Sequence, residues 1–170
     1  MPTRRRLLTA VVIATFAAAP IVAVAADSPE AFVASVFARV TAGDGSNGGS
    51  EITDRSARGR WFTRSVVDVW NKAEDRAEKD GDIGPIDFDL LTDSQDPEVR
   101  RVSIEPRGGQ PDRAVVRVGL FASRKVKQGE RPHSVIDVVV VREDGAWRID
   151  DLKQVSSSDP WSLRGLLSLP

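Results

Sequence analysis

Hydrophobic residues recur at helical spacing soon after residue 27. Ser28 can cap the free backbone N–H groups of a helix, and Pro29 suits the first helical position, where no N–H donor is needed. The apolar stripe that follows contains Phe32, Val33, Val36, Phe37 and Val40. The pattern predicts a helix that opens at Ser28 and stops at Gly43.

A second amphipathic stretch predicts a helix from about Ser56 to Lys79, with a break near Gly59. Its apolar stripe is Phe62, Val66, Val69, Trp70, Ala73 and Ala77. Trp61 and Trp70 lie on or beside this stripe, which favours core positions over cofactor platforms, and Trp70 is kept as a ligand-binding candidate. Between the two helices, 43–48 matches G-x-G-x-x-G without the strand and helix that a dinucleotide site needs, so 43–50 is predicted to be a connection.

The second half of the chain has the alternation of β-strands. Strands are predicted at Arg101–Glu105, Arg113–Ser123 and Ser134–Arg142. One side of the second carries Ala114, Val116, Val118 and Leu120. Asp144-Gly145 favours a two-residue turn, because both positions of that turn need positive φ. A hairpin therefore closes the sheet, and the following Asp159-Pro160-Trp161 starts a short helix, with Leu163, Leu166 and Leu167, that docks on it.

The hairpin turn fixes a register in which Val140 pairs with Ile149 and Val138 with Asp151. Strict alternation then puts Trp147, Ile149 and Asp151 on the apolar face of the sheet, together with Ile136, Val138 and Val140. Asp150 points to the other face as a solvated partner of Arg148, so the two adjacent aspartates are not a catalytic pair. Asp151 must find a partner, lie at the solvated strand end, leave through a bulge, or line a cavity.

The segment from Asp80 to Val99 holds seven acidic residues and no basic one. Oxygen-rich loops can bind calcium. However, the EF-hand spacing is absent, and aspartates beside glycine or proline are typical of turns. We therefore expect turns here and no metal site.

The first 26 residues have the three parts of a secretory signal peptide. A cationic start contains Arg4, Arg5 and Arg6, an apolar stretch follows, and small residues precede Asp27. The apolar run of about 16 residues is short against the roughly 20 of a membrane span. A loose twin-arginine match leaves the export route open. We expect cleavage before Asp27, a periplasmic or secreted protein without a membrane span, and one domain over residues 27–170.

Composition narrows the chemistry. The chain has no cysteine, no tyrosine and one histidine, His133, which removes disulfides, thiolate metal sites and cysteine nucleophiles. Its formal net charge of −1 shows no excess of basic residues of the kind typical of nucleic-acid-binding proteins.

The N-terminal helices, Phe88-Asp89, Ser94-Gln95-Asp96 and the hairpin sequence 145–151 resemble a bacterial family of exported proteins of unknown function. This family is placed in the cystatin-like or nuclear-transport-factor-like (SnoaL-like) superfamily. The resemblance implies an α+β fold in which a curved antiparallel sheet wraps around the N-terminal helices as a cone, with a short C-terminal helix. It implies no catalytic residues, and the superfamily includes both enzymes and members without catalysis.

We therefore expect an exported cell-envelope module that binds a small apolar ligand or a protein partner without catalysis, cofactor or metal. The candidate ligand-binding residues are Trp70, Asp89, Asp96, Trp147 and Asp151. The alternative is a hydrolase or isomerase with a buried carboxylate as general base, for which Asp89, Asp96 and Asp151 are candidates. That alternative gains support if Asp151 opens into a pocket and faces Arg117 or Arg142. The sequence leaves the oligomeric state open.

Overall fold

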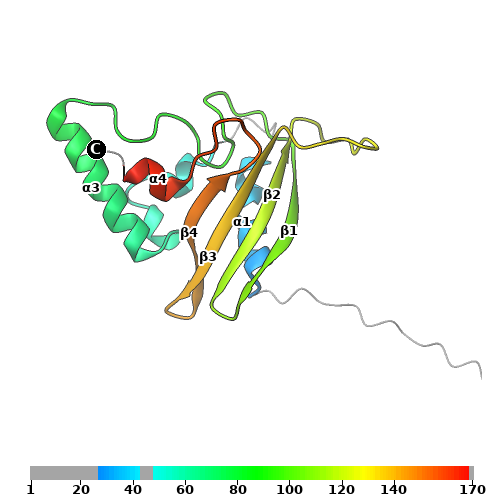
Figure 1. Cartoon of the computed structure of the whole chain (residues 1–170), viewed down its shortest axis with the longest axis horizontal. Coiled ribbons are helices and arrows are strands. Elements are labelled where there is room, and N and C mark those ends of the chain that lie inside the picture. The colour runs from blue at the N-terminus through cyan, green and yellow to red at the C-terminus, as the bar shows by residue number, and fades with distance from the viewer. Residues whose placement is uncertain (1–26, 43–47, 169–170) are drawn as a thin grey trace, which may run out of the picture.

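The computed structural model describes residues 27–42 and 48–168. The predicted signal peptide and residues 43–47 of the predicted connection lie outside the described residues. Figure 1 shows an α+β arrangement in which four antiparallel strands form one sheet in the order β1-β2-β3-β4. The elements are α1 (Pro29–Val40), α2 (Ser50–Thr53), η1 (Arg58–Arg60), α3 (Arg64–Asp80), β1 (Arg101–Gln110), β2 (Arg113–Phe121), β3 (Ser134–Glu143), β4 (Ala146–Gln154) and α4 (Leu163–Leu167).

Helix α1 confirms the first predicted helix. The Ser28 hydroxyl accepts a hydrogen bond from the Ala31 amide at 3.1 Å, and Pro29 occupies the first turn. Val33, Val36, Phe37 and Val40 are buried, and α1 contacts β1 and β2. The helix ends at Val40 with Thr41 as its C-cap, so it stops before Gly43.

The second predicted helix is wrong at its start. The stretch from Ser56 contains the short 3-10 turn η1, and the regular helix α3 begins at Arg64 because Thr63 caps it and accepts from the Val66 amide at 3.4 Å. The break near Gly59 is confirmed by η1. Val69, predicted on the apolar stripe, is 37% exposed, whereas Val66, Trp70 and Ala73 are buried.

The sheet has one face covered by α1 and packed into the core. The predicted inward set of β2, Ala114, Val116, Val118 and Leu120, is buried, as are Ile136, Val138 and Val140 of β3. On the opposite face, the Arg117 guanidinium binds the Asp137 carboxylate through two hydrogen bonds of 2.7 and 2.8 Å. The hydrogen bond that Arg117 donates to the Asp137 carboxylate raises the pKa of Arg117. In Figure 1, α1 lies behind the sheet while α3 stands beside its β4 edge.

The predicted hairpin turn is confirmed, since Asp144 and Gly145 have φ of 52° and 79°. Its register is also confirmed as far as the pair Val140–Ile149. Beyond that pair the prediction is wrong, because Asp150 is an extra residue in a β-bulge. Asp151 therefore pairs with Val139, and Leu152 takes the place opposite Val138.

The free edge of β4 is covered by segments from both ends of the domain. Trp61 and Thr63 exchange backbone hydrogen bonds of 2.7 and 2.9 Å with Ile149. Further along, the Gln154 amide donates to the Trp161 carbonyl at 3.0 Å. Helix α4 follows, with Ser162 as N-cap and with Leu163 and Leu167 buried against the core. The predicted C-terminal helix is thus present and contacts β4 and α3. Its predicted start at Asp159-Pro160-Trp161 is wrong, because Ser162 caps the helix, which begins at Leu163.

Candidate functional site

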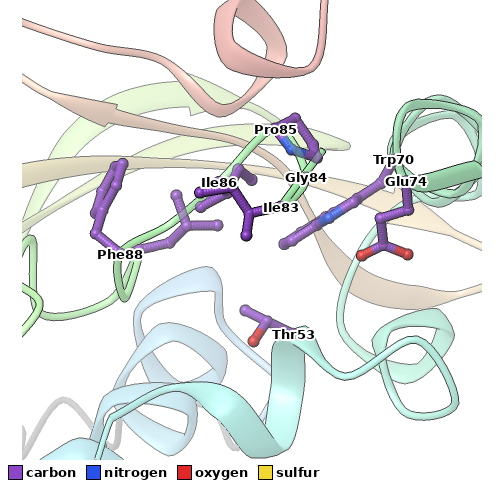
Figure 2. A pocket seen from close by; sticks show the side chains of 9 residues that line it. Thr53, Trp70, Glu74, Ile83, Gly84, Pro85, Ile86 and Phe88 are labelled. Carbon is purple, nitrogen blue, oxygen red and sulfur yellow. The ribbon is translucent and has the colours of Figure 1, made fainter. Parts of the chain in front are cut away.

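The side chains of Trp70 and Phe88 face each other across a pocket between α3 and the irregular segment 83–90. Figure 2 shows Trp70 and Glu74 of α3 on one side, Phe88 on the other, and Ile83 and Ile86 between them. The pocket has a volume of about 190 Å³. We call it the Trp70 pocket; its lining residues are Thr53, Trp70, Glu74, Ile83, Gly84, Pro85, Ile86, Phe88 and Leu90.

The local sequence explains why the pocket forms here. Gly81 ends α3 in the left-handed conformation, with φ of 76°, which turns the chain back along the helix. The next residues are rich in glycine, proline and acids, so they form no regular element and run over α3 as a loop. Their apolar members Ile86 and Phe88 pack against the core, whereas Ile83 is 91% exposed.

The polar side of the Trp70 pocket is built around a buried guanidinium. Arg58 is 2% exposed, and its carbon Cζ lies 4.3 Å from the centre of the Trp70 ring. Its Nε donates to the Thr53 carbonyl at 3.1 Å and its two terminal nitrogens to Asn71 and Glu74, at 3.3 and 2.5 Å. Glu74 therefore enters the pocket with its charge already compensated by Arg58.

The structure brings only one of the five predicted ligand residues, Trp70, into this pocket. Asp89 is adjacent to Phe88 in sequence, but its carboxylate accepts hydrogen bonds from the amides of Gly49, Leu91 and Thr92 and thereby fixes a turn. Asp96 is exposed, and its amide donates to the Ser94 hydroxyl at 3.0 Å. Both aspartates thus make the turn contacts expected of the acidic segment.

Trp147 lines a different pocket, of about 280 Å³, between the start of α1 and the β3–β4 hairpin. Its ring is 6% exposed, and its indole N–H donates to the Asp27 carbonyl at 2.9 Å. Arg142 reaches the same residue, with 2.6 Å between its terminal nitrogen and an Asp27 carboxylate oxygen. Trp147 therefore anchors the beginning of the described fold.

Asp150 and Asp151 are held by helix α4, which corrects two sequence-based expectations. The Asp150 carboxylate binds Arg164 at 2.5 Å, Arg113 at 3.2 Å and the Thr63 hydroxyl at 3.2 Å, and its side chain is 14% exposed. It is not the solvated partner of Arg148, whose guanidinium donates to the Trp147 carbonyl. Burial alone would raise the pKa of Asp150, but the Arg164 hydrogen bond and charge, with those from Arg113 and Thr63, hold this pKa below its usual range.

Asp151 does not lie beside Val138 on the apolar face, because the bulge shifts it by one pairing position. Its carboxylate accepts a hydrogen bond from the Arg164 amide at 3.1 Å and lies 3.8 Å from the Lys153 ammonium. Two of the outcomes expected for a buried Asp151, a bulge and a partner, are therefore combined here. Asp150 and Asp151 both contact Arg164, so strict alternation fails at this point.

The carboxylate-dependent alternative would have gained support from an Asp151 that faces Arg117 or Arg142 in a pocket. Arg117 instead binds Asp137, and Arg142 binds Asp27. The single histidine, His133, is exposed and contributes its backbone amide to the Leu120 carbonyl. Neither Arg117 nor Arg142 therefore contacts Asp151.

The described part of the chain comprises residues 27–42 and 48–168. Within these ranges, no three side chains of His, Cys, Asp or Glu come together in a way that could hold a metal ion. In the same part of the chain, no helix combines the length and the apolar character needed to cross a bilayer.

Sequence reasoning missed Glu74, Ile86 and Phe88 as pocket residues, and it missed Arg58 as the partner of Glu74. Glu74 could have been found, because it follows Trp70 by one helical turn and so shares its side of α3. Arg58 had no such signal, since its partners Asn71 and Glu74 are 13 and 16 positions away. Comparison of the chain with protein-family models, with curated proteins and with solved structures found no significant match.

Proposed function

We propose that the protein is a non-catalytic binding module that holds a small apolar group in the Trp70 pocket. The observation that supports this most is the composition of its lining, in which apolar and aromatic side chains surround Glu74, an ionisable group already bound by Arg58. Ligand pockets commonly combine such apolar walls with a few fixed polar groups.

The size of the pocket limits the ligand. Sites for drug-sized molecules have volumes of roughly 300–1,000 Å³, whereas this pocket measures about 190 Å³. A second pocket of about 300 Å³ adjoins it and shares Ile83, Gly84 and Pro85. A small apolar molecule, or one apolar side chain of a protein partner, fits the Trp70 pocket better than a large ligand does.

The indole N–H signals of the four tryptophans provide the test. Benzyl alcohol and 1-hexanol are titrated into ¹⁵N-labelled protein as small apolar probes. We expect saturable shifts of the Trp70 signal and none of the Trp147 signal. Ile83→Ser should weaken binding of the probes without unfolding the protein, because Ile83 is 91% exposed. The matched control is Val126→Ser, since Val126 is 81% exposed but far from the pocket lining. Equal effects of both substitutions, or an unmoved Trp70 signal, would contradict the proposal.

We also propose that the protein is exported to the bacterial cell envelope and processed before Asp27. The contacts of Asp27 with Trp147 and Arg142 support this boundary, because they attach the first residue after the predicted leader to the β3–β4 hairpin. Cell fractionation with N-terminal sequencing should recover a chain that starts at Asp27 outside the cytoplasm. An unprocessed cytoplasmic chain would contradict export.

The finer architecture is part of the same proposal. We take the sheet to be a cystatin-like cone whose concave side is the face that α1 covers, which the contacts of α1 with β1 and β2 support. Residual dipolar couplings of the strand amides measure the curvature directly. A flat sheet would contradict the cystatin-like cone, although the fold would still belong to the α+β class.

A further inference from the structure

The loop 122–133 between β2 and β3 is an exposed segment rich in basic residues. In Figure 1 this yellow loop extends well beyond the β1 edge of the sheet. Within it, one acidic residue, Glu130, accompanies four basic ones: Arg124, Lys125, Lys127 and Arg131. We call residues 122–133 the basic loop.

The acidic residue of the basic loop is used to fix the loop to the sheet. The Glu130 carboxylate accepts hydrogen bonds from Arg101 of β1 at 2.8 Å and from the Lys127 amide at 3.3 Å. The Glu130 amide in turn donates to the Lys127 carbonyl at 3.1 Å, and Gly129 closes this turn with φ of 73°. The loop therefore has a defined shape, and its negative charge points inward.

Three of the basic side chains in the basic loop face solvent. Lys125, Lys127 and Arg131 are exposed, and within 27–42 and 48–168 none of the three makes a salt bridge. Between the two lysines lies Val126, which is 81% exposed. An apolar side chain at the tip of a projecting cationic loop gains from contact with a surface that offers both negative charge and an apolar layer.

We infer that the basic loop docks on the surface of an anionic phospholipid bilayer. Its basic side chains would contact lipid phosphates while Val126 enters the interface. A soluble polyanion would be attracted by the charges alone and would leave Val126 in water, so the apolar tip favours the membrane. The contact is peripheral. It uses none of the lining residues of the Trp70 pocket, and it stands independently of the function proposed for that pocket.

Co-sedimentation with phospholipid vesicles tests this inference. The protein from Asp27 onward is used, since it contains all the contacts described above and lacks the basic, apolar leader, which would bind lipid by itself. We expect binding to phosphatidylcholine vesicles only when they also contain phosphatidylglycerol. High salt should abolish it, because the Debye length falls to about 3 Å at 1 M salt.

Paired substitutions locate the contact. Each Lys near an anionic surface contributes about fivefold in affinity, so K125Q/K127Q should weaken vesicle binding about 25-fold. V126S should weaken it about threefold, because the side chain is only partly buried at the interface. The control K72Q/K79Q removes the same charge from exposed lysines of α3 and should bind like the parent. All variants should retain the parental melting temperature, since these side chains are exposed.

Four outcomes would overturn the inference: no binding to anionic vesicles at low salt, equal binding to neutral vesicles, equal losses in K125Q/K127Q and K72Q/K79Q, or capture by heparin without capture by anionic vesicles. The last would indicate a soluble polyanion instead. A Trp70 pocket that binds no apolar probe leaves these results unaffected, so failures of the two proposals are distinguishable.

Discussion

The two edge strands of the sheet each carry a one-residue bulge, and the two bulges are managed in opposite ways. In β4 the extra residue is Asp150, which is held by Thr63, Arg113 and Arg164 beneath neighbouring segments. In β1 the extra residue is Arg107, between Pro106 and Gly108, and it is exposed. One edge is thus covered by other parts of the chain. At the other, no segment other than β2 within 27–42 and 48–168 bridges to β1, and the bulge interrupts the strand.

This difference shows two solutions to the same problem. The free N–H and C=O groups of an edge strand invite pairing with other chains. At β4 the segments 61–63 and 161–162 satisfy part of that edge. At β1, Pro106 removes a donor and the bulge at Arg107 disturbs the ladder, which discourages pairing without any cover. The covered edge therefore contributes to stability, and the open edge mainly to solubility.

The largest expected contrast comes from one substitution made at each edge. Ile149 in β4 is fully buried, so Ile149→Ala should lower the free energy of unfolding by about 2–5 kcal/mol. Ile104 in β1 is only partly buried, so Ile104→Ala should cost about half as much. Urea denaturation measures both. Equal losses would show that β1 is as well covered as β4.

The bulged residues themselves give the next contrast. Asp150→Asn removes a charge that three side chains bind, and we expect a loss of about 1–2 kcal/mol, since charged hydrogen bonds contribute more than neutral ones but Arg113 and Arg164 are partly exposed. Arg107→Gln should change the free energy of unfolding by less than about 0.5 kcal/mol. A silent Asp150→Asn would restore the solvated Asp150 that the sequence alone predicts.

A smaller difference between Asp150→Asn and the parent is expected in the pH dependence of stability. Because Asp150 has a lowered pKa in the folded protein, its ionised form stabilises the fold above the ordinary carboxyl value of about 4. That stabilisation is lost as the pH falls through the lowered pKa. We therefore expect Asp150→Asn to lose less stability than the parent on acidification below about pH 4. Parallel stability curves for the two proteins would contradict this assignment.

The smallest effect on stability, with a distinct effect on association, is expected at Pro106. Pro106→Val should change the free energy of unfolding by less than about 0.5 kcal/mol, because the residue is exposed. It should, however, increase concentration-dependent association in static light scattering, since it restores a donor at the open edge. An unchanged association state would show that the bulge alone protects β1.

Local chemistry explains what the sequence could predict. Ser28 and Pro29 start α1, and Asp144-Gly145 sets the hairpin, because each depends on its own backbone conformation and nearest neighbours. The bulge at Asp150 depends on partners 14, 37 and 87 positions away, and no periodicity contains that information. Likewise, the helical periodicity identified Trp70. The segment that brings Phe88 opposite Trp70 is irregular, so it has no hydrophobic periodicity from which the contact could be predicted.

Arg164 and Trp161 reach the ribosome exit only after all of β4 has been made. Until then, Asp150 lacks its contact with Arg164, and the part of the β4 edge that pairs with Trp161 is exposed. Partly folded chains with unpaired strand edges are prone to aggregation. We therefore expect chains shortened before residue 161 to be less stable than chains that include α4, even though all four strands are present.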